Sequence, residues 1–134
     1  MLKRALAALV VAAALVIAVQ PFDAAEPVRY RITFPEPEHR WMQVEVTLAE
    51  TGRAPVDLHM SRSSPGRYAW HNFAKNVYDV HAWGGECRTS ACELPLTHLD
   101  DSTWRVAPPD DRLTVQYKVY GDRVDGTYLA VDTT

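Results

Sequence analysis

Apolar and polar residues alternate with a period of two along three stretches of the chain, while a sustained helical stripe is missing beyond its N-terminal segment. The alternating apolar positions are Val28, Tyr30, Ile32 and Phe34; Met42, Val44, Val46 and Leu48; and Leu113, Val115, Tyr117 and Val119. Because successive side chains of a β-strand point to opposite faces, each stretch predicts a half-buried strand. We expect the apolar set of each strand to pack against a core and the polar set to face water.

Shorter strand candidates lie between and after these stretches, at 56–60, 77–83, 103–106 and 127–131. Turn residues such as the pair Gly84-Gly85 separate them where the strand patterns stop. A helical turn or two is expected only at 68–75. Together these elements predict an all-β chain, an antiparallel β-sandwich of about seven or more short strands.

The N-terminal segment has the pattern of a secretory leader. Lys3 and Arg4 precede an unbroken apolar run over 5–19, which Pro21 ends. Such a run is too short for a bilayer-spanning helix, which needs about 20 apolar residues, but it fits a signal peptide. We therefore predict a signal-peptide helix at 1–25, a mature domain at 26–134 and a periplasmic or secreted location. An uncleaved leader is the alternative, and it would be the domain's only contact with a membrane.

Composition and charge narrow the class of partner. The chain has 134 residues, of which 47% are hydrophobic and 23% are charged, as expected for one soluble domain with a core. The formal net charge is −3, with both signs interspersed. This balance lacks the basic surface that nucleic acid or an anionic membrane would attract, so neither is expected as a partner.

Two cysteines, Cys87 and Cys92, lie close together just after Gly84-Gly85, in a segment that reads as a loop or hairpin tip. In an oxidising compartment a local disulfide is the first expectation, and two free thiols are the alternative. A zinc site would need two further ligands nearby.

No residue pattern of a catalytic centre is found in the sequence. The five histidines, at 39, 59, 71, 81 and 98, do not form an H-E-x-x-H motif. The serines of the run that includes Ser63 and Ser64 lack the G-x-S-x-G arrangement of a nucleophile elbow. We therefore assign no catalytic residue, no metal ligand and no cofactor to this chain.

One polar loop is nevertheless a candidate site. It brings together two guanidinium groups, two hydroxyls and a phenol around a Pro-Gly turn; its candidate residues are Arg62, Ser63, Ser64, Arg67 and Tyr68. Such a set can bind a carboxylate or the backbone of a neighbouring domain, which makes it a candidate interdomain or substrate-side loop. The alternative is a structural loop whose arginines bond sheet-end carbonyls.

Several separate blocks, in order along nearly the whole chain after the leader, resemble one known family. The blocks are YRITFPEP at 30–37, HRWMQV at 39–44, RSSPGRY at 62–68, FAKNVYDV at 73–80 and YGDRVDGTYLAVD at 120–132. They are similar to the N-terminal domain of the glycyl aminopeptidases, the PDZ-containing zinc metallopeptidases of metallopeptidase family sixty-one. Two departures are Ser61, where a proline commonly stands, and the Cys87–Cys92 segment.

The resemblance implies a multidomain exported enzyme of which this chain is the opening, non-catalytic part. The family's catalytic domain, with H-E-x-x-H and a distal Glu as zinc ligands, and its PDZ domain would then be partners from the same polypeptide, and the full enzyme would act on peptides. Zinc is expected in that absent catalytic domain. The resemblance further implies that the β domain packs on the catalytic domain, helps to shape its substrate cleft and exposes an apolar patch there. The alternative is a stand-alone periplasmic module that binds a ligand or peptide in a defined pocket.

Overall fold

The computed structural model describes residues 25–64, 66, 69–123 and 130–133. Its strands are β1 (Arg29–Thr33), β2 (Trp41–Leu48), β3 (Val56–His59), β4 (Val77–Gly84), β5 (Thr97–Asp100), β6 (Thr103–Val106) and β7 (Leu113–Tyr120). Three short 3-10 turns, η1 (Pro37–His39), η2 (Phe73–Asn76) and η3 (Ser90–Cys92), are the other regular elements. Within these ranges no helix is long and apolar enough to cross a membrane.

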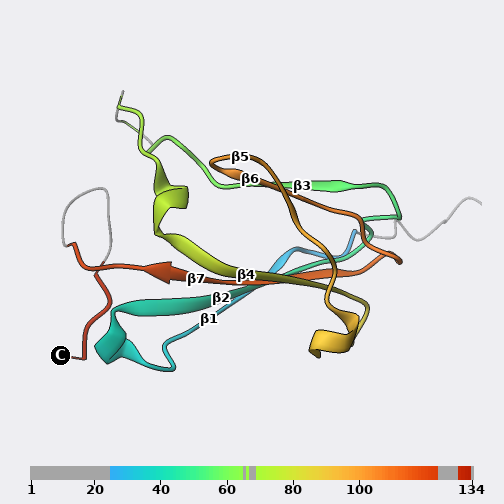
Figure 1. The fold of residues 1–134 in the computed structure, drawn as a ribbon, viewed down its shortest axis with the longest axis horizontal. Coiled ribbons are helices and arrows are strands. Elements are labelled where there is room, and N and C mark those ends of the chain that lie inside the picture. The colour runs from blue at the N-terminus through green and yellow to red at the C-terminus, as the bar shows by residue number, and fades with distance from the viewer. Residues whose placement is uncertain (1–24, 65, 67–68, 124–129, 134) are drawn as a thin grey trace, which may run out of the picture.

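The strands form two antiparallel sheets (Figure 1). The larger sheet has the order β1-β2-β7-β4, and the smaller has the order β3-β6-β5. Every neighbouring pair is antiparallel. For the described residues, the prediction of an all-β fold with antiparallel strands is thus confirmed.

Side chains from both sheets build one core. Ala82 of β4 and Leu113 of β7 are fully buried. Val115 of β7 and Val106 of β6 complete the central cluster. Partly buried apolar residues of both sheets and of the segment before β5 pack around it; they are Leu48, Val56, Leu58, Val80, Leu94, Leu96 and Tyr117. Apolar burial of this kind is the main source of stability in a domain of this size. The smaller sheet therefore lies chiefly over β7 and β4.

Most strand predictions agree with the structure to within a residue or two. The exceptions are informative. β5 carries no alternating pattern and was not predicted, while the helical turn expected at 68–75 is reduced, among the described residues, to η2. The leader at 1–24 and most of the strand predicted at 127–131 lie outside the described residues.

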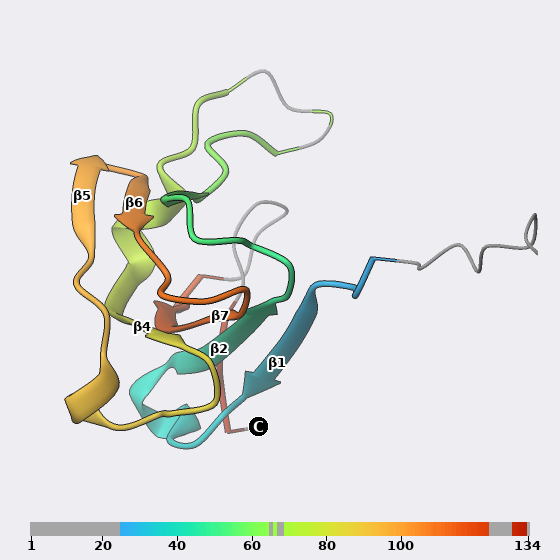
Figure 2. The same cartoon turned by 90° about the vertical axis from the view of Figure 1, so that its right-hand side faces the viewer.

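The expectation that the apolar side of β1 packs into the core is wrong. Tyr30 and Ile32 of β1 are 67% and 53% exposed, and Val28 and Phe34, which flank the strand, are 48% and 56% exposed. β1 is exposed because it is an edge strand and the smaller sheet covers the larger one near its other edge, over β7 and β4. Figure 2 shows β1 on the side of the molecule away from β5 and β6.

Candidate functional site

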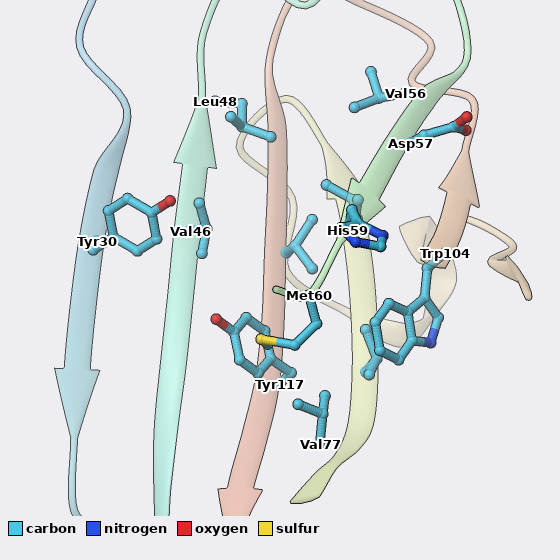
Figure 3. A pocket seen from close by; sticks show the side chains of 13 residues that line it. Tyr30, Val46, Leu48, Val56, Asp57, His59, Met60, Val77, Trp104 and Tyr117 are labelled. Carbon is cyan, nitrogen blue, oxygen red and sulfur yellow. The ribbon is translucent and has the colours of Figure 1, made fainter. Parts of the chain in front are cut away.

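An apolar cleft opens between the two sheets where the smaller one stops short of β1. It consists of two adjoining hollows, each of about 280 Å³, that share Tyr30, Met60, Val77 and Tyr117. Figure 3 shows these four side chains turned toward the same space from β1, β4, β7 and the segment after β3. The cleft is thus floored by the larger sheet and bordered by the exposed residues of β1.

The lining of the cleft is mainly apolar, and its polar residues include Asp57, His59 and Asn76. Further apolar side chains line it; they are Ile32, Val44, Val46, Leu58, Phe73, Trp104 and Val119. Burial raises the pKa of the Tyr117 phenol above its ordinary value. A surface of this kind gains free energy from contact with another apolar surface.

A β-bulge on β4 gives the cleft two of its valines. Strict alternation would place Val77 and Val80 on opposite faces, yet both line the cleft. Asp79 has a left-handed backbone (φ 56°), and the pairing with β7 shifts register between Tyr78 and His81. The extra residue therefore turns Val80 inward and leaves Asp79 and His81 on the outer face.

The predicted polar loop begins beside this cleft and is anchored at its base. The backbone N–H of His71 donates to the carbonyl of Arg62 at 2.8 Å, and the N–H of Met60 donates to the carbonyl of Ser102 at 2.9 Å. Because Met60 and Phe73 line the cleft, the loop leaves and re-enters the fold at its border.

Arg62 pairs with a carboxylate. Its guanidinium Nη2 lies 3.0 Å from Oδ1 of Asp100, at the end of β5. Asp100 also accepts hydrogen bonds from the N–H of Ser102 and the hydroxyl of Thr103, and the Ser102 N–H is the largest cause that lowers the pKa of the carboxyl. Arg62 thus ties the loop to the β5–β6 turn.

The other predicted loop residues are only partly described. The hydroxyl of Ser61 donates to the carbonyl of Ser63 at 3.0 Å, and Ser64 is half-buried. Arg67 and Tyr68 lie outside the described residues, so their predicted role stays a prediction.

The outer face of the larger sheet carries a charged network that sequence reasoning missed. Nδ1 of His81 lies 2.6 Å from Oε1 of Glu93, and Nε2 of the same ring lies 3.0 Å from Oδ1 of Asp79. The ammonium of Lys118 lies 2.8 Å from the other oxygen of Asp79 and 4.5 Å from the centre of the Trp41 ring. Glu93 is the largest cause that raises the pKa of His81, and Lys118 is the largest cause that lowers the pKa of Asp79.

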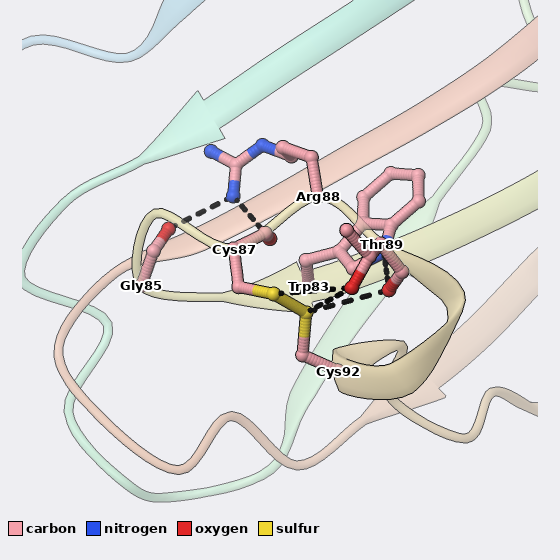
Figure 4. Close-up of a disulfide and its surroundings, with 6 residues drawn as sticks. All are labelled: Trp83, Gly85, Cys87, Arg88, Thr89 and Cys92. Carbon is pink, nitrogen blue, oxygen red and sulfur yellow. Dashed lines mark hydrogen bonds between the residues drawn. A yellow bond between two sulfur atoms is a disulfide. The ribbon is translucent and has the colours of Figure 1, made fainter.

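A loop closed by a disulfide continues this network at the end of β4. Cys87 and Cys92 are bonded, with Cα atoms 6.2 Å apart. Figure 4 shows the indole N–H of Trp83 donating to the carbonyl of Thr89, at 3.1 Å, and Arg88 bridging the carbonyls of Gly85 and Cys87.

The far end of this loop returns to β4. The N–H of Leu94 donates to the carbonyl of Ala82 at 2.8 Å, and Trp83 forms an isolated bridge with Glu93. The loop therefore covers the β4 edge of the larger sheet.

The described residues do not assemble a metal centre. Groups of three or more histidines, cysteines or carboxylates able to hold a metal are missing from the described ranges. His81 binds its two carboxylates through opposite ring nitrogens, so these three side chains cannot converge on one ion. His59 contacts the hydroxyl of Thr103 instead. These residues do not fit a zinc ion, and we derive no catalytic step from them.

The described residues form two antiparallel β-sheets with an apolar cleft along the β1 edge of the larger sheet. Residues 29–134 match the family described as the peptidase M61 N-terminal domain, and the chain belongs to that family. No curated protein matches the chain.

The fold is similar to that of a solved structure. It is the crystal structure of an aminopeptidase N family protein from Idiomarina loihiensis, with a TM-score of 0.63 and 23% sequence identity. The similarity covers 74% of this chain but 16% of that one. This similarity supports the fold. Because the chain spans only 16% of the longer protein, the similarity does not establish an activity for this chain.

Proposed function

We propose that this chain is the non-catalytic N-terminal β-sandwich of an exported, glycyl-aminopeptidase-like zinc metallopeptidase. Its apolar cleft packs on the catalytic domain of the same polypeptide and helps to shape the substrate cleft there. The observation that carries the proposal is the row of exposed apolar residues on β1, at the border of a cleft that the smaller sheet leaves uncovered.

Family membership supports a second body of protein in the same chain, because the family is defined as the N-terminal domain of a peptidase. The path of the last described residues agrees with this. The N–H of Val131 donates to the carbonyl of Gly121 at 2.9 Å, next to Tyr120, which lines the cleft. In a longer polypeptide, the next domain would thus start beside the cleft.

The remaining parts of the proposal follow from the leader and the family. The basic and apolar leader favours export to the periplasm or outside the cell, where the Cys87–Cys92 disulfide would persist. Zinc and the general base would reside in the catalytic domain, and a PDZ domain would follow it. The polar loop at 62–68 would contact the catalytic domain or its peptide substrate.

The first test is to read the coding sequence beyond Thr134. An in-frame H-E-x-x-H motif followed by a distal Glu is the expected result. A stop codon directly after Thr134 would contradict the proposal.

A second test uses two substitutions on β1 in the longer enzyme. Ile32→Asp places a charge on the cleft side, whereas Thr33→Asp places the same charge on the other face of the strand. We expect Ile32→Asp to loosen domain docking, measured as faster proteolysis between the domains and a raised KM, with Thr33→Asp close to wild type. Equal effects of both substitutions would argue against docking through this face.

One observation favours a second candidate function. The cleft has the volume of a small-ligand site and offers the phenols of Tyr30 and Tyr117 beside apolar walls. A stand-alone module that binds an apolar ligand or peptide would use the same surface. Saturable quenching of intrinsic fluorescence by an aromatic dipeptide, abolished by Tyr117→Ala, would support this alternative.

A further inference from the structure

His81 occupies a position that only its protonated form satisfies. Both ring nitrogens face a carboxylate oxygen, at 2.6 Å from Glu93 and 3.0 Å from Asp79. A neutral imidazole has one N–H and one lone pair, so it can donate to just one of these acceptors. The imidazolium ion donates to both.

The groups around the ring do not replace the second N–H that the two carboxylates need, so His81 must supply it. Lys118 of β7 holds the second oxygen of Asp79, and this ammonium keeps Asp79 ionised. Gln116 of β7 pairs opposite His81 and is uncharged, and the ring stacks on Trp83 at 5.8 Å between centroids.

Charged groups further along the same face are more distant. Beyond Gln116, the next residues in register are Glu45 of β2 and then Arg31 of β1. The two carboxylates in direct contact therefore dominate the environment of the ring.

The two carboxylates belong to different parts of the fold, the β4 bulge and the segment that follows the disulfide-closed loop. Asp79 forms the left-handed corner of the bulge, which is a backbone conformation that costs free energy and needs support from its surroundings. Glu93 follows the disulfide-closed loop that covers the β4 edge. One side chain thus joins the bulge to the loop.

We propose that His81 is a pH-operated clamp that, when protonated, holds the β4 bulge and the disulfide-closed loop together. Loss of the proton releases one of the two carboxylates. Because the bulge turns Val80 into the cleft while Val77 lines it as well, release alters the cleft from the opposite face of the sheet. This inference concerns the domain's own fold and stands whether or not the cleft binds a catalytic domain.

An NMR titration of the full chain, with its disulfide formed, tests the clamp. The His81 ring is expected to titrate with a midpoint above the ordinary value of about 6.5, and the amides of Val77 and Val80 should shift with the same midpoint. Amides that stay constant while His81 titrates would overturn the coupling to the cleft.

Three variants separate the clamp from a merely structural histidine. Glu93→Gln and Asp79→Asn each remove one negative charge with little change in shape, and Asn tolerates the left-handed backbone at position 79. Both should lower the His81 midpoint, whereas His39→Gln, at an exposed site on η1, should leave it unchanged. An unchanged midpoint in both carboxylate variants would overturn the proposal, even if the cleft proves to bind its partner.

Discussion

The two edges of the larger sheet are finished in opposite ways. At the β4 edge, a disulfide-closed loop returns to the strand and a charged network fixes the outer face. At the β1 edge, no described strand pairs with the outer side, and the apolar residues of β1 are about half exposed or more. An alternating apolar pattern therefore identifies a strand with one apolar face. Whether that face is buried within the domain or left for another surface depends on the position of the strand in the sheet.

The largest expected effect contrasts the stability of the buried core next to β4 with that of the exposed face of β1. Leu113, fully buried opposite Gly84 of β4, should cost about 2–5 kcal/mol in free energy of unfolding when replaced by Ala. Ile32→Ala on β1 should cost less than about 1 kcal/mol, because roughly half of that side chain already faces water. Urea unfolding of both variants measures the difference. Similar losses would mean that β1 is covered within the domain.

Removal of the disulfide should weaken the β4 edge less than the loss of a core leucine. Closing so short a loop stabilises the folded state by about 2 kcal/mol in the chain-entropy description. Replacing both Cys87 and Cys92 by Ser should therefore lower the melting temperature moderately. The Trp83 indole should also become more accessible to a fluorescence quencher, because Thr89 of this loop accepts its hydrogen bond. Unchanged quenching would mean that the loop stays in place without its covalent link.

Stability should also depend on pH through the β4 edge. The folded-state pKa of His81 is raised, so its contribution is fully present below about 6.5 and is lost as the pH rises through the folded value. The folded-state pKa of Asp79 is lowered, so its contribution is present above about 3.9 and is lost as the pH falls further. Melting temperatures measured across pH should be highest in the mildly acidic range. His81→Gln should abolish the decrease in melting temperature above the mildly acidic range. If the decrease persists in this variant, another group causes it.

The smallest effect is expected in the loop beside the cleft. The Arg62–Asp100 pair is exposed to solvent, which screens it, so Arg62→Ala should scarcely change the melting temperature of the domain. In the longer enzyme, Arg62→Ala together with Arg67→Ala should raise KM or loosen docking if the loop meets substrate or the catalytic domain. Arg112→Ala, which breaks a partly exposed pair with Glu26 outside the cleft lining, is the control. Wild-type kinetics in the double variant would leave the loop a purely structural role.

Sequence patterns predicted the strands well where apolar and polar residues alternate strictly in the sequence. β2 and β7 lie in the middle of the larger sheet, and their observed bounds extend the predicted ones by about a residue. β5 was not predicted because none of its residues is buried. It is a strand because its backbone pairs with β6, and its sequence has no apolar face that would indicate this.

The candidate site was harder to predict, because its features depend on contacts between distant segments. The spacing of three between Val77 and Val80 hints at a bulge once the cleft is known, but the left-handed backbone of Asp79 has no clear mark in the sequence. Glu93 meets His81 only because the loop returns to β4. The exposure of β1 likewise depends on where the smaller sheet ends.

The open edge of β1 has a consequence during synthesis. This domain leaves the ribosome before any segment that follows it, so β1 would wait with free backbone hydrogen-bonding groups and an apolar face. Such edges promote self-association of newly made chains. Arg29 and Arg31, exposed on the other face of the strand, would place repelling like charges on any two copies that paired there. We expect the two arginines to disfavour such pairing, Arg29 to a smaller extent because it is paired with Glu26 at 3.0 Å.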